Sequence, residues 1–321
     1  KFPDHARGLP PAGILDRCHA TRTCPKIIEH FGAAEIWGLK LGPEWVGTDP
    51  HTDIPLPKNV RRYYLPSTPH GGGSGGFNVT PAAAPSCPSV GYGMGTFPNN
   101  PVPHSQTVTA IRFHFRNWVM AGIEPPPSRY PTLRGSKGER DLVPPTKKAM
   151  GFPNNVPGVP ASAPTGLINP VLDYDFGSEF NYTDASGVQT MFPPIVKRVI
   201  PALVPRVDAD GNELGGVPIV LRDAPLGTYL GWNITAAGFH KDKICNYAGG
   251  MIPFATTQAE RLANNDPRLS LEERYGDHAG YVAAVERAAL NAVAQGFLLQ
   301  ADADALVAAA RDSNVLIPLI P

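Results

Sequence analysis

Pro-Lys-Ile-Ile-Glu-His-Phe-Gly at residues 25–32 and Asn-Val-Arg-Arg-Tyr-Tyr-Leu at residues 59–65 are the two runs that decide the fold. Both are short, contain β-branched or aromatic residues and end at glycine or proline, a pattern typical of buried strands. A carboxylate, Glu35, follows the first run after three residues, and a histidine, His70, follows the second after five. The stretch 25–76 therefore predicts a strand, an acidic loop, a second strand and a histidine loop.

An acid and a histidine placed just after neighbouring strands suit the last two members of a nucleophile–acid–base triad. A triad histidine has to face both the acid and the nucleophile, so it belongs on a loop at a strand end. His70 is therefore the predicted general base and Glu35 the predicted acid. Asp49 and Asp53 lie between the same two runs and are the alternative acids.

Further segments extend this pattern along the chain. A cysteine pair precedes Pro-Lys-Ile, Ala-Glu-Ile-Trp occupies residues 34–37, and Pro-His-Gly follows the second predicted strand at 69–71. Four later segments belong with them: Glu-Pro-Pro-Pro-Ser-Arg-Tyr-Pro at 124–131, Val-Asp-Ala-Asp-Gly-Asn-Glu at 207–213, Gly-Trp-Asn at 231–233 and Ile-Pro-Phe-Ala at 252–255. Together they resemble the second half of a secreted α/β-hydrolase-domain family.

The resemblance implies a serine-type hydrolase that cleaves carboxylic (acyl) esters with a Ser-Glu-His triad and no metal or organic cofactor. In such proteins the nucleophilic serine precedes all of these segments. We therefore expect it on an N-terminal fragment or a second chain, as in a proteolytically processed heteromer. The expected substrate is a small-molecule or polymeric ester. The alternative function is a non-catalytic secreted binding or structural protein on a hydrolase-derived scaffold.

A glycine-rich stretch follows His70 directly. Gly-Gly-Ser-Gly-Gly at 72–76 fits the nucleophile pattern Gly-x-Ser-x-Gly, and His-Gly-Gly-Gly at 70–73 fits an oxyanion motif of some esterases. A nucleophile elbow needs a strand before its serine and a helix after it, but prolines follow here at 81 and 85. Ser74 is thus only a weak alternative nucleophile. His104 and His114 lack partners at metal-ligand spacing and are expected in core or surface positions.

Composition excludes several classes of partner. The 28 basic and 28 acidic residues of the 321-residue chain cancel, which argues against a nucleic-acid partner. No run of about 18 apolar residues occurs, so no membrane span is predicted. The four cysteines allow two disulfides, Cys18 with Cys24 and Cys87 with Cys245. Disulfides would indicate a secreted or periplasmic protein, whereas four free thiols would suit the cytosol.

The predicted fold class is α/β. It consists of the C-terminal part of an α/β-hydrolase sheet, with its last strands and a flanking helix, then a loop-rich, partly β appendage and a helical C-terminus. Residues 1–135 would form the hydrolase core with the acid and histidine loops, 136–255 the appendage and 256–321 the helical region.

The sequence also predicts local structure in three regions. A helix is expected over 105–121, where apolar residues recur at helical spacing before Gly122, with Ser105 as its N-cap. Strand-like runs at 197–207 and 216–221 are expected to form a hairpin around Asp-Ala-Asp-Gly-Asn rather than a calcium loop. The C-terminal region should contain a capping box from Ser270 to Glu273, a helix over 279–295 and a last helix capped by Asp302.

Overall fold

The computed structural model describes residues 2–4, 9–48, 50–80, 82–88, 91–135, 140–181 and 186–317. The strands are β1 (Phe2–Asp4), β2 (Leu9–Ala12), β3 (Ile27–Gly32), β4 (Val60–Leu65), β5 (Leu142–Val143), β6 (Val171–Asp175), β7 (Ile195–Ile200), β8 (Val204–Pro205), β9 (Gly227–Leu230) and β10 (Gly250–Pro253). The helices are α1 (Asp16–Thr21), α2 (Ala33–Leu39), α3 (Gly42–Val46), α4 (Ser105–Ala121), α5 (Lys147–Met150), α6 (Val220–Asp223), α7 (Gln258–Ala263), α8 (Leu271–Tyr275), α9 (His278–Ala294) and α10 (Gln300–Arg311).

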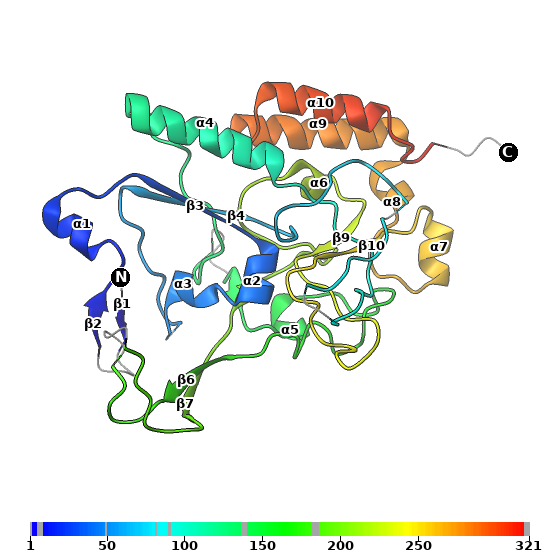
Figure 1. Cartoon of the computed structure of the whole chain (residues 1–321). Coiled ribbons are helices and arrows are strands. Elements are labelled where there is room, and N and C mark those ends of the chain that lie inside the picture. The colour runs from blue at the N-terminus through cyan, green and yellow to red at the C-terminus, as the bar shows by residue number, and fades with distance from the viewer. Residues whose placement is uncertain are drawn as a thin grey trace.

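β3 and β4 form the parallel pair that positions the candidate site (Figure 1). Their register pairs Ile27 with Val60 and Gly32 with Leu65, which confirms both predicted strands. Most of β4 is buried, as expected for a strand of a covered parallel sheet. Because the strands are parallel, their carboxyl ends meet at one edge, and the segments bearing Glu35 and His70 both leave from it.

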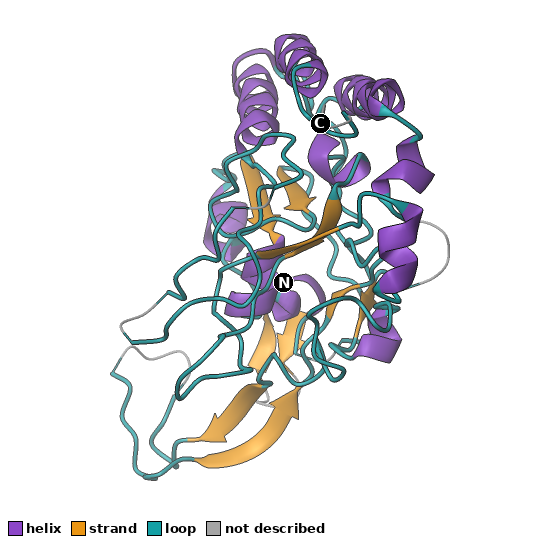
Figure 2. Ribbon diagram, turned by 90° about the vertical axis from the view of Figure 1, so that its right-hand side faces the viewer, coloured by secondary structure: helices purple, strands orange, loops and turns teal. Residues whose placement is uncertain are grey.

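Helices cover the pair on both sides. α2 and α3 belong to the crossover between β3 and β4 and lie on one side of the strands, while α4, α9 and α10 lie along the other (Figures 1 and 2). The chain is therefore an α/β structure, as predicted. No helix in the described ranges is long and apolar enough to cross a membrane.

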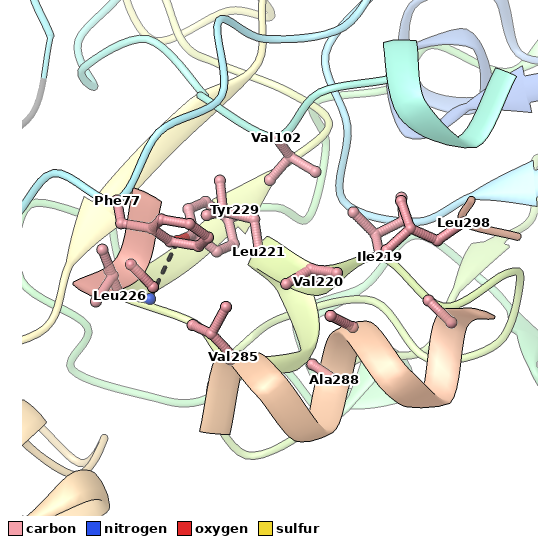
Figure 3. Close-up of a cluster of buried hydrophobic side chains, with 14 of the residues drawn as sticks. Phe77, Val102, Ile219, Val220, Leu221, Leu226, Tyr229, Val285, Ala288 and Leu298 are labelled. Carbon is pink, nitrogen blue, oxygen red and sulfur yellow. Dashed lines mark hydrogen bonds between the residues drawn. The ribbon is translucent and has the colours of Figure 1, made fainter. Parts of the chain in front are cut away.

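Two buried clusters flank β4 because successive side chains of a strand point to opposite faces. Tyr63 belongs to one cluster and Tyr64 to the other. In the Tyr63 cluster, Val220 of α6 faces Val285 and Ala288 of α9 (Figure 3). That cluster draws residues from all three predicted segments of the chain, and the division at residues 135 and 255 stays a prediction.

The helix predictions are largely confirmed. α4 spans 105–121 and ends at Gly122 in the left-handed conformation, with a φ of 72°, although its N-cap is His104 rather than Ser105. Ser270 and Glu273 form the expected capping box, and α9 matches the predicted 279–295 helix. The prediction for Asp302 is wrong, since α10 begins after Leu299 and Asp302 lies in its first turn. Buried Leu298 just before α10 indicates that core packing sets this start.

The predicted hairpin is only half right. Its turn exists: the Asp208 N–H donates to the Asn212 carbonyl over 2.8 Å, and Val207 bridges Glu213 antiparallel. The second strand, 216–221, is wrong, because the chain runs there as loop into α6. Pro218 within that run has no N–H to give to a ladder. The first strand, 197–207, is not continuous either, because β7 ends at Ile200 and β8 covers only Val204–Pro205. The antiparallel partner of β7 is β6, and that of β8 is β5.

Both predicted disulfides are confirmed, Cys18–Cys24 and Cys87–Cys245. The bonded cysteines are 6 positions apart in the first disulfide and 158 positions apart in the second. The second bond therefore joins the irregular stretch after the histidine loop to the segment that follows β9.

Replacing Cys87 and Cys245 together by serine is expected to lower the free energy of unfolding by about 2–4 kcal/mol, because the bond restricts a long loop in the unfolded chain. Urea unfolding of the oxidised proteins measures this difference. The matched control replaces Cys18 and Cys24, whose short loop predicts a smaller loss. An equal or larger loss in the control would contradict the expectation.

Candidate active site

Glu35 and His70 leave the same edge of the β3–β4 pair by different routes. β3 ends at Gly32, the extended N-cap of α2, so that Glu35 lies in the first turn of that helix. β4 ends at Leu65, and the chain turns through Ser67, whose φ is 57°, before it reaches His70. A short helix and a tight turn thus bring Glu35 and His70 together, although they are 35 positions apart in the chain.

The two side chains are in direct contact. His70 Nδ1 lies 2.6 Å from Glu35 Oε1, a hydrogen-bond distance typical of a charged partner. The His70 side chain is 56% exposed and that of Glu35 is 14% exposed. Since Nδ1 faces the carboxylate, Nε2 is the ring nitrogen left for a reacting partner. The ring of Tyr247 lies beside the imidazole, with centroids 5.2 Å apart.

Backbone contacts join the acid helix to the histidine loop. The Ala33 N–H donates to Thr68 Oγ1 over 3.2 Å, and the Ala34 N–H donates to the Thr68 carbonyl over 3.1 Å. The Asn100 side-chain amide donates to the Ser67 carbonyl over 2.8 Å. The first N–H groups of α2, which have no partners within the helix, are therefore satisfied by the loop that carries His70.

A buried carboxylate, Glu213, supports both segments. Its oxygens accept hydrogen bonds from Trp37 Nε1 (3.1 Å) on α2, from the Tyr64 hydroxyl (2.6 Å) on β4 and from the Ser67 N–H (2.7 Å). Burial raises the pKa of Glu213, while these three donors act in the opposite direction. Sequence reasoning missed this residue; its only signal was its place at the end of the 207–213 segment.

Two more histidines lie close to Glu35. Burial lowers the pKa of His30, with Glu35 opposing that change. Burial likewise lowers the pKa of His104 to about 4, again with Glu35 opposing. The sequence predicted His104 in a core or surface position and gave no sign of its nearness to the acid.

The alternative residues occupy other environments. Asp53 Oδ1 accepts a hydrogen bond from the Leu133 N–H over 2.8 Å, so this carboxylate anchors a loop, and Asp49 lies outside the described residues. The Ser74 side chain is exposed, and its hydroxyl contacts the Gly75 carbonyl at 3.4 Å. Within the described ranges no helix follows Ser74 until α4 begins.

In the Asp-Ala-Asp-Gly-Asn turn, an aspartate side chain accepts hydrogen bonds from the backbone of the turn itself. Asp208 Oδ1 accepts hydrogen bonds from the Asp210 and Asn212 N–H groups, each over 2.9 Å. This is the arrangement of an aspartate that stabilises a turn. Across the described residues, no group of three or more His, Cys, Asp or Glu side chains is arranged to hold a metal ion.

Comparison with known families agrees with this architecture. The family model described as alpha/beta hydrolase domain matches residues 3–308. The chain belongs to this α/β-hydrolase family. No curated protein and no solved structure matches this chain. Membership in the α/β-hydrolase family indicates a hydrolase-type function.

Proposed function

We propose that the protein is a serine-type hydrolase of carboxylic esters in which His70 is the general base and Glu35 the acid. The observation that supports this most is the 2.6 Å contact between His70 Nδ1 and Glu35 Oε1 beside an otherwise exposed imidazole. A half-buried acid oriented toward one ring nitrogen fixes the tautomer, so that the other nitrogen can accept a proton.

The reaction follows from these roles. The serine oxygen attacks the ester carbonyl carbon while its proton passes to His70 Nε2, and Glu35 stabilises the imidazolium that forms. His70 then returns that proton to the alcohol oxygen as the carbon–oxygen bond breaks, which leaves an acyl-serine. Water, deprotonated in the same way, releases the carboxylic acid and restores the serine. The ester is a small molecule or part of a polymer.

The nucleophile is assigned to a segment outside residues 1–321, N-terminal in the family order or on a second chain produced by processing. The open edge of β3 supports this proposal. Within the described part of the chain, β3 is hydrogen-bonded to β4 along one side only. An exposed strand edge offers unpaired N–H and C=O groups to another strand. A strand of the nucleophile-bearing segment would pair there and extend the sheet.

The cysteines bear on the compartment of the protein. Two disulfides persist in an oxidising environment, which supports a secreted or periplasmic protein.

Fluorophosphonate labelling of the native preparation, with intact-mass analysis of every polypeptide, tests the proposal. The expected result is covalent label on a second, co-purifying chain or on sequence N-terminal to residue 1, since only an activated serine reacts. Label on this chain would move the nucleophile to Ser74. The absence of label from all polypeptides would contradict a serine hydrolase and favour a binding or structural protein on this scaffold.

A further inference from the structure

Glu35 has a second carboxylate oxygen that His70 does not use. Oε2 of Glu35 is buried and has no hydrogen-bond partner among the described residues. A second buried atom in the same condition is Nε2 of His104. An unpaired buried oxygen or nitrogen costs free energy, so two of them in one place indicate that they act on each other.

Gly32 shows how close the two atoms are. A Cβ atom built on Gly32 would lie 2.7 Å from Glu35 Oε2 and 2.9 Å from His104 Nε2. Both atoms therefore border the space that a side chain at position 32 would fill. The two polar atoms thus face the same small space, where a hydrogen bond between them would satisfy both.

The backbone of His104 is fixed at this place. His104 is the N-cap of α4, and its carbonyl accepts the Val108 N–H over 2.9 Å. On the side of the His70 loop, a Cβ atom on Gly72 would lie 2.7 Å from the His104 nitrogen and 3.0 Å from its Cβ. The close approach and a φ of 85° explain glycine at position 72. His104 is thus packed between the strand that precedes the acid and the loop that carries the base.

We propose that His104 is a positioning residue that directs its Nε2–H at Glu35 Oε2 and so keeps Oε1 facing His70. Glu35 then lies between two histidines with different tasks. The exposed His70 exchanges protons with the reacting groups, and the buried His104 holds the carboxylate. The part that His104 plays in catalysis rests on the proposed function, whereas its contact with Glu35 does not.

The surroundings of His104 suit a neutral donor. The titratable groups that face it are Glu35 from α2, His30 from β3 and His70 from the loop. The pKa of His104 is lowered to about 4; burial is the largest cause, Glu35 opposes it, and His30 and His70 act in the same direction as burial. At neutral pH the ring is therefore uncharged and carries one N–H.

The test compares the NMR resonance of the His70 Nδ1–H proton, which lies in the 2.6 Å contact with Glu35 Oε1, in the native protein and in two His104 variants at one fixed pH. His104→Phe keeps a ring but removes the donor, and Glu35 is then free to turn away from His70. We expect the low-field resonance of this short hydrogen bond to move upfield and broaden, because the carboxylate no longer holds one orientation. His104→Gln keeps an N–H near the position of Nε2 and is expected to restore most of the native resonance position. In ester hydrolysis, His104→Phe should lower kcat about tenfold and leave KM unchanged, as for a group that acts in the transition state.

A third variant acts from the opposite side. A methyl group on Gly32 would lie 2.7 Å from Glu35 Oε2, 2.7 Å from Thr68 Oγ1 and 2.9 Å from His104 Nε2, so Gly32→Ala should shift the same His70 resonance even where His104→Phe fails to fold. An unchanged resonance in the folded variants, or an equal change in His104→Gln and His104→Phe, would overturn the proposal. The NMR measurement needs no activity, so a native protein that takes no fluorophosphonate label would refute the hydrolase function and leave this test decisive.

Discussion

Ester hydrolysis by the native protein is expected to fall by about 10⁴-fold in kcat/KM when His70 is replaced by alanine. Without the imidazole, nothing accepts the serine proton during attack or returns it to the leaving alcohol. Because the His70 side chain is 56% exposed, its loss should change the free energy of unfolding by less than about 1 kcal/mol. Steady-state kinetics together with urea unfolding separates lost chemistry from lost structure.

Combining the His70 and Glu35 substitutions shows whether the two residues act together. Glu35 is proposed to act only through His70, so Glu35→Gln alone should slow hydrolysis strongly but add little to His70→Ala. Additive losses in the pair would show that Glu35 acts by another route. The matched control is His19→Ala, an exposed histidine on α1, which should hydrolyse ester at the native rate. A His70→Ala protein with near-native activity would refute the role of His70.

Replacement of Glu213 by alanine is expected to lower the free energy of unfolding by about 3–5 kcal/mol. The change leaves three buried donors without an acceptor, namely Trp37 Nε1, the Tyr64 hydroxyl and the Ser67 N–H. Each unsatisfied buried group costs about 1–3 kcal/mol, and partial relaxation recovers some of that sum. Urea unfolding at constant pH measures the loss, and Glu213→Gln, which keeps one acceptor oxygen, should cost less.

The pH dependence of this loss has a definite sign. Burial raises the pKa of Glu213 above its ordinary value of 4.5 in the folded protein. The folded state then holds the proton to a higher pH than the unfolded state does, so the contribution of Glu213 is largest below pH 4.5 and declines as pH rises through the folded pKa. The difference between native protein and Glu213→Ala should accordingly shrink as pH rises. A difference that grows with pH would contradict the raised pKa.

The sequence predicted the features that depend on neighbouring residues. β3 and β4 follow from two runs of strand-forming residues, α4 from apolar residues at helical spacing, and the capping box from Ser270 and Glu273. The acid and histidine could be named because parallel strands bring their carboxyl ends together, which places Glu35 and His70 at one edge. The predicted strand 216–221 failed for a local reason, since Pro218 interrupts it, and the predicted strand 197–207 is divided into β7 and β8.

The tertiary structure alone decided which groups support that pair. Glu213 lies 146 positions from Ser67 and 176 from Trp37, and no local pattern distinguishes it from a surface glutamate in a turn. In sequence, His104 resembles any histidine before a helix; only its packing against Gly32 and Gly72 places it near Glu35. The physical reason is that strand, helix and turn preferences arise within a few residues, whereas burial and hydrogen-bond partners arise only when distant segments pack.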